Sequence, residues 1–412
     1  MRLRVSGWWR VVGAGRAPSA LAVLLLIPPF TGCSEEDALE PICENGVDCD
    51  WVDVGSSVWM ACALRSEGTV FCWGTNRDGE LGDGTTKERF SPVQVQGLTD
   101  VVDLTVGGRQ ACVIRADGTA WCWGLNHGLL GDGTTAHRTS PVQVLLSGEV
   151  VAIGMHWSST HALLSDGTVW RWGSELGPTP QLYPDIDNVQ SLSNRGQCAV
   201  KNDGTAWCWG DNDHGRLGWG SWANSDVPVQ VMGLTDVLQV SDGDEYACAV
   251  TAAEEIWCWG DNGVRQLGDG TTEDASAPVK ADVAVGAVSV SAGDSHTCGT
   301  WRDGSAYCWG SDSFGAIGTN SSYSEQPIHI SGLSDVMVIR PISYELATLA
   351  ITADGALWGW GRLRPMLPLQ VTSLDIIGAS GGDDQYVADP YLVIDPYPPD
   401  VAPIVCFSEP DH

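Results

Sequence analysis

The chain has 412 residues, 50 of them glycine and 20 tryptophan, and its Asp and Glu residues outnumber Lys and Arg by 31. This charge repels phosphate backbones and anionic membrane surfaces, because proteins bind nucleic acids by neutralising phosphates with Lys and Arg. The charge argues against a nucleic-acid partner, and the composition is typical of an all-β chain with many tight turns.

The first 33 residues have the layout of a secretory signal peptide. Four arginines precede an apolar run over 20–27, and small residues then lead to Cys33. The end of this leader resembles a bacterial lipobox, in which Cys33 becomes the acylated N-terminus, with Phe30 where leucine is usual. A retained transmembrane anchor is the alternative, but it needs about 20 apolar residues. We expect an exported protein, lipid-anchored to the bacterial cell envelope or secreted, with no other membrane contact.

A repeat follows an acidic tether at 34–50. Seven Trp-Gly dipeptides recur at intervals of 50, 49, 37, 50, 50 and 51 residues, at Trp73, Trp123, Trp172, Trp209, Trp259, Trp309 and Trp360. A period near fifty indicates a repeat architecture. We therefore assign residues 51–394 to one cyclic array and 395–412 to a Pro-rich tail.

Ten of the 14 cysteines form five pairs ten residues apart. These are Cys62 and Cys72, Cys112 and Cys122, Cys198 and Cys208, Cys248 and Cys258, and Cys298 and Cys308. In the first pair the turn at 66–68 ends in glycine, which predicts a three-residue hairpin loop with Cys62 opposite Cys72. Opposed residues of a hairpin lie close enough for a disulfide.

The two other repeats lack both cysteines of the pair. They carry His161 with Arg171, and Leu349 with Gly359. Joint retention or joint loss favours disulfides, which an exported address permits. Separate packing of two small buried side chains would leave single cysteines, and the short spacing of most zinc sites is absent. Cys43, Cys49 and Cys406 stay unassigned.

The second repeat predicts four strands, at 100–106, 111–114, 119–123 and 141–144. Both faces of the inner hairpin are apolar, as expected for strands packed between neighbouring sheets. Four strands per repeat are typical of a propeller blade. The fold prediction is an all-β, seven-bladed β-propeller of four-stranded blades.

A glycine-rich segment joins the third and fourth strands. It reads Asn-Arg-Asp-Gly-Glu-Leu-Gly-Asp-Gly-Thr-Thr at 76–86 and is echoed at 212–220, 262–272 and 312–319. Its glycines suit turns with positive φ. Calcium binding is the alternative, but the segment lacks the residue spacing of an EF-hand. With the Trp-Gly dipeptide before it, this segment resembles the repeat of the regulator of chromosome condensation family, whose members form seven-bladed propellers.

The resemblance also sets expectations for the irregular repeats. The third and seventh repeats lack the 76–86 segment, so their blades should have short connections. Residues 374–394 resemble the opening of another repeat, so we expect the C-terminus to close the ring against the N-terminal strands.

The founding member of that family exchanges nucleotide on a small GTPase and binds chromatin. The leader and the acidic charge oppose that role here, and no repeat is long enough to carry an inserted wedge. A secreted bacterial β-lactamase inhibitor with the same fold indicates that exported members can be purely protein binders. The histidines are scattered singly, and motifs of hydrolases and phosphate loops are missing.

We therefore predict a non-catalytic recognition propeller with no cofactor or metal and an unidentified protein partner. A secreted lyase or hydrolase with a channel site and an exchange factor are the alternatives. A four-stranded meander places the first-to-second and third-to-fourth connections at one end, where recognition is expected. Trp219 and Trp222 stand there, with folding back over their own loop as the alternative. The predicted partner-binding residues are Trp219, Trp222, His156, Trp157, Asp244, Glu245 and Tyr246.

Overall fold

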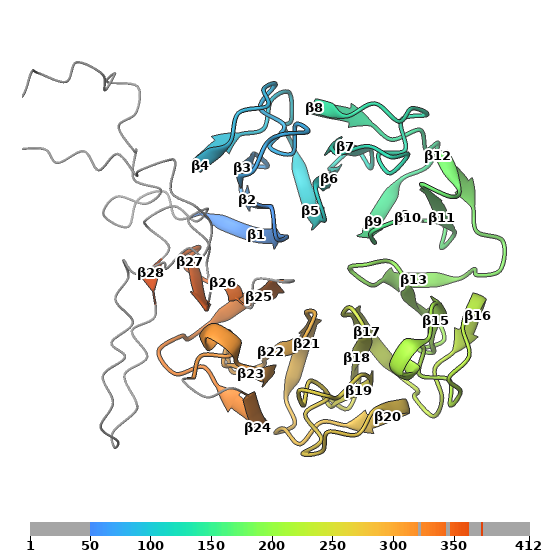
Figure 1. Cartoon of the computed structure of the whole chain (residues 1–412), viewed down its shortest axis with the longest axis vertical. Helices are drawn as coiled ribbons and strands as arrows, with labels where there is room; N and C mark the ends of the chain where they lie inside the picture. The colour runs from blue at the N-terminus through green and yellow to red at the C-terminus, as the bar shows by residue number, and fades with distance from the viewer. Residues whose placement is uncertain (1–49, 320–322, 343–346, 362–371, 374–412) are drawn as a thin grey trace, which may run out of the picture. The chain divides into compact units, whose positions relative to one another are not determined.

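The computed structural model describes residues 50–319, 323–342, 347–361 and 372–373, which belong to one compact unit. These residues form seven four-stranded sheets arranged as the blades of a propeller (Figure 1). Each blade is made from one continuous stretch of chain, with its strands in sequence order. The predicted all-β, seven-bladed fold is confirmed. No helix among the described residues is long and apolar enough to span a membrane.

The strand bounds follow the repeat closely. Blades 1 to 3 comprise β1 (Trp51–Ser56), β2 (Met60–Arg65), β3 (Val70–Gly74), β4 (Arg89–Gln94); β5 (Val101–Gly107), β6 (Gln110–Arg115), β7 (Ala120–Gly124), β8 (Arg138–Gln143); and β9 (Val150–Met155), β10 (Ser159–Leu164), β11 (Val169–Gly173), β12 (Gly177–Leu182). Blades 4 and 5 comprise β13 (Val189–Leu192), β14 (Cys198–Lys201), β15 (Ala206–Gly210), the 3-10 turn η2 (Asp213–Gly215), β16 (Ser225–Gln230); and β17 (Val237–Asp242), β18 (Tyr246–Thr251), β19 (Ile256–Gly260), β20 (Ala275–Lys280). Blades 6 and 7 comprise β21 (Ala287–Ala292), β22 (His296–Trp301), β23 (Ala306–Ser311), the 3-10 turn η3 (Ser313–Gly315), β24 (Tyr323–His329); and β25 (Val336–Ile342), β26 (Ala347–Thr352), β27 (Leu357–Gly361), β28 (Thr372–Ser373).

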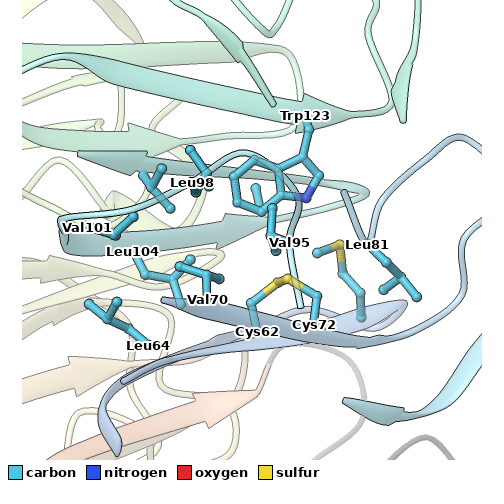
Figure 2. Close-up of a cluster of buried hydrophobic side chains, with 13 residues drawn as sticks. Cys62, Leu64, Val70, Cys72, Leu81, Val95, Leu98, Val101, Leu104 and Trp123 are labelled. Carbon is cyan, nitrogen blue, oxygen red and sulfur yellow. A yellow bond between two sulfur atoms is a disulfide. The ribbon is translucent and has the colours of Figure 1, made fainter. Parts of the chain in front are cut away.

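Blades pack face to face because both faces of each inner hairpin are apolar. On one face of blade 1, Cys62, Leu64 and Val70 meet Leu104 and Trp123 of blade 2 (Figure 2). The opposite face of the same hairpin packs against blade 7 in a separate buried cluster, which includes Ala63, Trp73, Leu349 and Ile351. The interfaces between blades are therefore the hydrophobic core of this protein.

Ring closure uses the same packing. Blade 1 and blade 7 share a buried cluster, and each retains its own strands. The outermost strand of blade 7, β28, pairs in parallel with β27, whereas the other paired strands are antiparallel. The predicted closure by residues 374–394 lies outside the described residues. The short connection expected in blade 3 is confirmed, because residues 174–176 alone join β11 to β12, while that of blade 7 falls on residues that are not described.

The five predicted disulfides are present and buried. They join Cys62 to Cys72, Cys112 to Cys122, Cys198 to Cys208, Cys248 to Cys258 and Cys298 to Cys308. Each bridge links directly opposed residues of the second and third strands, as the hairpin register requires. Where the cysteines are missing, His161 faces Arg171 and Leu349 faces Gly359. Cys33, Cys43, Cys49 and Cys406 lie outside the described residues.

A buried tryptophan ties each of four blades to the blade before it. The indole Nε1 of Trp123 donates a hydrogen bond to the carbonyl of Glu80 at 2.8 Å, across 43 positions of sequence. Trp172, Trp259 and Trp309 repeat this bond to Leu129, Arg216 and Gln266. The acceptors all lie in the glycine-rich segment between the third and fourth strands. This segment therefore serves as a receptor for the Trp-Gly dipeptide of the next blade.

The close approach of this tryptophan explains the Leu-Gly step of the segment. Gly82 has a φ of +65°, and a Cβ there would lie 2.9 Å from the Trp123 Nε1. Leu81 is fully buried beside it. A side chain at Gly82 would strain the backbone and displace the indole, because the left-handed region disfavours residues with a Cβ.

The polar residues of the glycine-rich segment form hydrogen bonds with one another. Asn76 is buried, its amide donates to Asp83 and to the Lys87 carbonyl, and its oxygen accepts the Leu81 N–H at 3.0 Å. Asp83 also accepts hydrogen bonds from Thr85. These side chains therefore form a hydrogen-bonded network that shapes the segment.

Replacement of Trp123 by phenylalanine tests the bond between blades. Trp123→Phe leaves the Glu80 carbonyl buried without its donor, which costs about 1–3 kcal/mol beyond the loss of packing. The matched control is Trp209→Phe, because the Trp209 Nε1 is buried with no acceptor among the described residues. Urea denaturation should show a larger loss of unfolding free energy for Trp123→Phe. Equal losses would contradict the role given to this hydrogen bond.

Removal of one bridge tests the disulfides. The double replacement Cys62→Ala with Cys72→Ala should lower the free energy of unfolding by about 2–3 kcal/mol, because an open hairpin regains chain entropy in the unfolded state. Thermal unfolding of the oxidised protein measures this loss, and peptide mapping without reductant checks all five pairs. Free thiols at these positions in exported protein would refute the assignment.

Candidate functional site

The propeller has two ends with different connections. The first-to-second and third-to-fourth connections of each blade lie at one end, here called the loop end. The tight turns between second and third strands lie at the other, here called the turn end. The innermost strands of the seven blades surround the centre of the ring (Figure 1). A central cavity of about 240 Å³, here called the channel, is lined by residues of these strands and by the loop-end residues His156, Trp157 and Arg195.

Arg195 organises the channel mouth at the loop end. It follows β13, and its guanidinium pairs with Asp244 of blade 5 at 2.9 Å and with Asp294 of blade 6. Its own backbone N–H donates to Asp242 at 2.9 Å. Although burial opposes the charge, Asp294, Asp244 and Asp242 hold the pKa of Arg195 above its usual value. Asp244, a predicted partner-binding residue, is thus part of an ion-pair network that joins blades 4, 5 and 6.

His156 and Trp157 lie on the same mouth, in the connection between β9 and β10. Trp157 is 46 % exposed, and its ring lies over Gly108 of blade 2. His156 is half-buried, and burial together with the positive charge of Arg195 lowers its pKa. The side chain is therefore a neutral hydrogen-bonding group at neutral pH. Both side chains are thus partly exposed at the loop end.

The two tryptophans of blade 4 have different environments. Trp222 is 57 % exposed and stands against the Gly215 backbone of η2. Trp219 is half-buried and packs against the core cluster between blades 4 and 5. The packing of Trp219 matches the alternative in which its ring folds back, whereas Trp222 is the more exposed of the two.

Tyr246 requires a correction. It is 1 % exposed, and its hydroxyl donates to the carbonyl of His296 in blade 6 at 2.7 Å. Burial raises the pKa of this phenol. Tyr246 joins two blades and offers no surface to a partner.

Glu245 belongs to a cluster that the sequence did not predict, centred on His214. The His214 Nε2 lies 3.2 Å from Glu245, and its Nδ1 lies 2.7 Å from Asp274 and 3.8 Å from Asp261. The hydrogen bond to Asp274 raises the pKa of this imidazole, although partial burial opposes the charge. His214, Asp261 and Asp274 are also close enough to hold a divalent metal. In this structure they connect blade 4 to blade 5 directly.

A second unpredicted group lies inside the channel. Asp53 and Asp103 occupy equivalent positions on β1 and β5, and Arg340 of β25 lies 3.5 Å from Asp53. Burial, and then the charge of Asp53, raise the pKa of Asp103 to about 6. Burial also raises the pKa of Asp53. The only sequence signal was the Val-Asp-Val and Val-Asp-Leu text of the first two repeats.

His161 and His296 are packing residues. His161 is buried and packs against Trp209, and burial lowers its pKa to about 3. His296 is buried with its Nε2 3.0 Å from the Thr348 hydroxyl, and burial lowers its pKa to about 4. Both rings are neutral parts of the interfaces between blades.

The raised pKa of Asp103 predicts a pH dependence of stability. A carboxyl whose pKa is about 3.8 unfolded and about 6 folded binds its proton more tightly in the folded state, so the free energy of unfolding falls as pH rises from about 4 to 6. Asp103→Asn mimics the protonated form and should stabilise the protein at pH 7.5 by about 2–3 kcal/mol, with no gain below pH 4.

Denaturant titration at several pH values measures this difference. The control is Asp117→Asn at the turn end of the same blade, where the carboxylate accepts hydrogen bonds from Thr119 that lower its pKa. That replacement should not stabilise the protein. A pH-independent gain for Asp103→Asn would contradict the titration argument.

Comparison with known proteins agrees with the geometry. The model of the regulator of chromosome condensation (RCC1) repeat matches residues 67–114, 203–250 and 254–299, and a second model of the same repeat matches 51–80 and 287–316. No curated protein matches the chain.

Solved structures share the fold at low identity. Prp20p from Saccharomyces cerevisiae is 21 % identical with a TM-score of 0.64, over 72 % of this chain and 82 % of that one. Human WBSCR16 is 16 % identical with a TM-score of 0.63, over 71 % and 84 %. Yeast RCC1 bound to Kap60 is 20 % identical with a TM-score of 0.63, over 72 % and 80 %. The chain therefore contains regulator of chromosome condensation (RCC1) repeats and folds as a seven-bladed β-propeller.

Proposed function

We propose that this protein is an exported, non-catalytic recognition propeller that binds a protein partner at its loop end. It is tethered to the cell envelope through a lipid on Cys33 or secreted. The observation that carries the proposal is the exposure of tryptophan side chains on the loops of a rigid ring. Trp222 is 57 %, Trp157 46 % and Trp59 38 % exposed, in connections of blades 4, 3 and 1. Exposed tryptophan is the residue type most enriched among binding hot spots.

The Trp59 ring is held in place by charged side chains. Trp59, which the sequence analysis missed, stands beside the Arg109 guanidinium, 5.6 Å from its ring centroid. Arg109 is in turn fixed by Asp78 at 2.7 Å and by the buried Glu80 at 2.6 Å. A surface that is ordered before binding loses little conformational entropy on binding, which favours affinity.

The disulfides support the exported address. Five bridges between buried cysteines persist in an oxidising compartment and are rare in the cytosol. They are compatible with a leader at 1–33, whose lipid attachment at Cys33 remains part of the proposal. The exchange activity of the family's founding member gains no support from the loop-end geometry described here.

Replacement of neighbouring tryptophans separates binding from folding. Trp222→Ala should weaken capture of the partner by about thirtyfold, the equivalent of about 2 kcal/mol, and leave the melting temperature nearly unchanged. Trp219→Ala, three positions away in the same loop, should lower the melting temperature because its ring packs against the core. The measurement is quantitative capture of periplasmic or medium proteins by the immobilised full chain, followed by calorimetry of each variant.

Two outcomes would contradict the proposal. Retention of every captured protein by Trp222→Ala would show that the loop end is not the recognition surface. Turnover of a captured protein by the wild-type chain would show that the propeller is catalytic.

A further inference from the structure

The turn end carries a ring of exposed apolar residues that the repeat does not require. In each of the seven blades the first strand skips one residue in its pairing with the second, which is a β-bulge. In blade 1, for example, Trp51 pairs with Arg65 and Asp53 with Leu64, so Val52 is left unpaired. The bulge residues are Val52, Val102, Val151, Gln190, Leu238, Val288 and Met337.

Six of these seven side chains are apolar and exposed. Their exposed fractions are 46 % for Val52, 59 % for Val102, 45 % for Val151, 57 % for Leu238, 50 % for Val288 and 65 % for Met337. Neighbouring innermost strands lie side by side around the channel (Figure 1), so these residues encircle its mouth at the turn end. Single exposed apolar residues are ordinary, but an exposed apolar residue at the same position of six innermost strands around one opening indicates an interaction surface. We call these six residues the apolar ring.

Part of the apolar ring forms a pocket at the seam between blades 7 and 1. Val52 and Met337 line this cavity of about 340 Å³, together with Trp51, Ile351 and the turn at 352–355. Asp50 also contributes to the lining, and Asp354 belongs to the turn. A side chain entering this pocket would meet both apolar groups and carboxylates.

Acidic residues surround the apolar ring on all sides. The turns between second and third strands contribute the exposed residues Glu67, Asp117, Asp166, Asp203, Asp303 and Asp354, and the segments before the first strands contribute Asp100, Glu149, Asp236 and Asp335. Backbone bonds keep these two sets together, as when the Ala116 N–H donates to the Asp100 carbonyl and the Ala353 N–H to that of Asp335.

Only some acidic residues at this end are paired with cations. Ion pairs join Arg65 to Asp50 at 3.5 Å, Arg115 to Asp100 and Asp117 at 3.7 and 3.6 Å, Lys201 to Asp187, and Arg302 to Glu254. Glu149 and Asp236 make no ion pair within the part of the chain that the structure describes. The turn end therefore combines an apolar centre with a net negative surround.

We propose that the apolar ring is a second docking surface, whose occupant is a segment of a partner protein that presents apolar side chains flanked by lysine or arginine. The apolar side chains would cover the bulge residues and enter the seam pocket, while the cations would face the surrounding carboxylates. Such complementarity sets partner choice and speeds association, and its contribution falls with ionic strength. The surface lies opposite the loop end and is independent of the tryptophans there.

The test uses the full chain and a labelled peptide of alternating leucine and lysine, followed by fluorescence anisotropy at physiological salt. Two matched peptides separate the contributions, one of serine and lysine and one of leucine and glutamate. We expect the leucine–lysine peptide to bind with a Kd below about 100 µM and the other two at least about tenfold more weakly. Equal binding of the serine–lysine peptide would overturn the proposal, because charge alone would then explain the affinity.

Two pairs of replacements locate the site. Val52→Ser with Met337→Ser removes the seam pocket, and Val102→Ser with Val151→Ser removes another arc of the apolar ring. Each pair should weaken the leucine–lysine peptide by about tenfold. The control is Val227→Ser with Met232→Ser, on and beside β16, where the exposed fractions are similar at 52 % and 56 %.

Binding that is unaffected by both ring variants, or equally weakened by the control, would refute the docking surface. Trp222→Ala at the loop end should leave peptide affinity unchanged. A loss of affinity in Trp222→Ala would place the peptide at the loop end and overturn the assignment. All the replaced side chains are exposed, so circular dichroism should show that the variants are folded. One folded ring variant is enough to decide whether the peptide binds at the apolar ring.

Discussion

The hydrogen bond from a buried indole to the preceding blade is the interaction on which the other features of this propeller depend. A blade is a small sheet with apolar side chains on both faces, so a single blade is not stable on its own. The Trp123 bond to Glu80 fixes the distance and angle at which blade 2 covers blade 1. Three further indoles repeat the bond at the same spacing of 43 residues. The glycine-rich segment therefore recurs within the chain because it accepts the indole of the following blade.

The same bond positions the loop end. The segment that accepts the Trp123 indole also carries the Glu80 side chain, which pairs with Arg109 beneath Trp59. In blade 4 the Arg216 carbonyl accepts the Trp259 indole, and the Arg216 guanidinium donates to the Asp244 carbonyl at 2.7 Å. Interfaces between blades and the exposed surface are thus built from one set of residues. The disulfides act within single blades, because each joins two strands of one blade, although the buried cysteines also pack in the interface with the next blade.

Features that recur in the sequence were predictable, and features created by contact between different blades were not. The strands, the cysteine pairs and the packing role of His296 follow from positions that repeat about every fifty residues. Tyr246 occupies the same repeat position as His296, and this equivalence would have predicted its burial. Trp219 and Trp222 could not be separated, because their exposure depends on how one irregular loop folds over its own blade.

The charged clusters show most clearly which features could not be predicted from the sequence. His214 meets Asp274 across 60 positions, and Asp103 meets Asp53 across a blade interface. Neither contact has a local sequence pattern, because each depends on the adjacency of blades. The apolar ring was also missed, since one valine among several in a strand gives no sign that a bulge turns it outward. A propeller's blades are predictable from the repeat, whereas its functional surfaces arise where residues of different blades meet.

Exchange of the indole protons tests the central claim most directly. Labelling tryptophan with ¹⁵N and following the indole N–H signals in D₂O reports each bond between blades separately. The account predicts that Trp123, Trp172, Trp259 and Trp309 exchange together and only through global unfolding, while the exposed Trp222 exchanges at once. Rapid or independent exchange of those four indoles in the folded protein would contradict it, and would show that the blades are held together by packing alone.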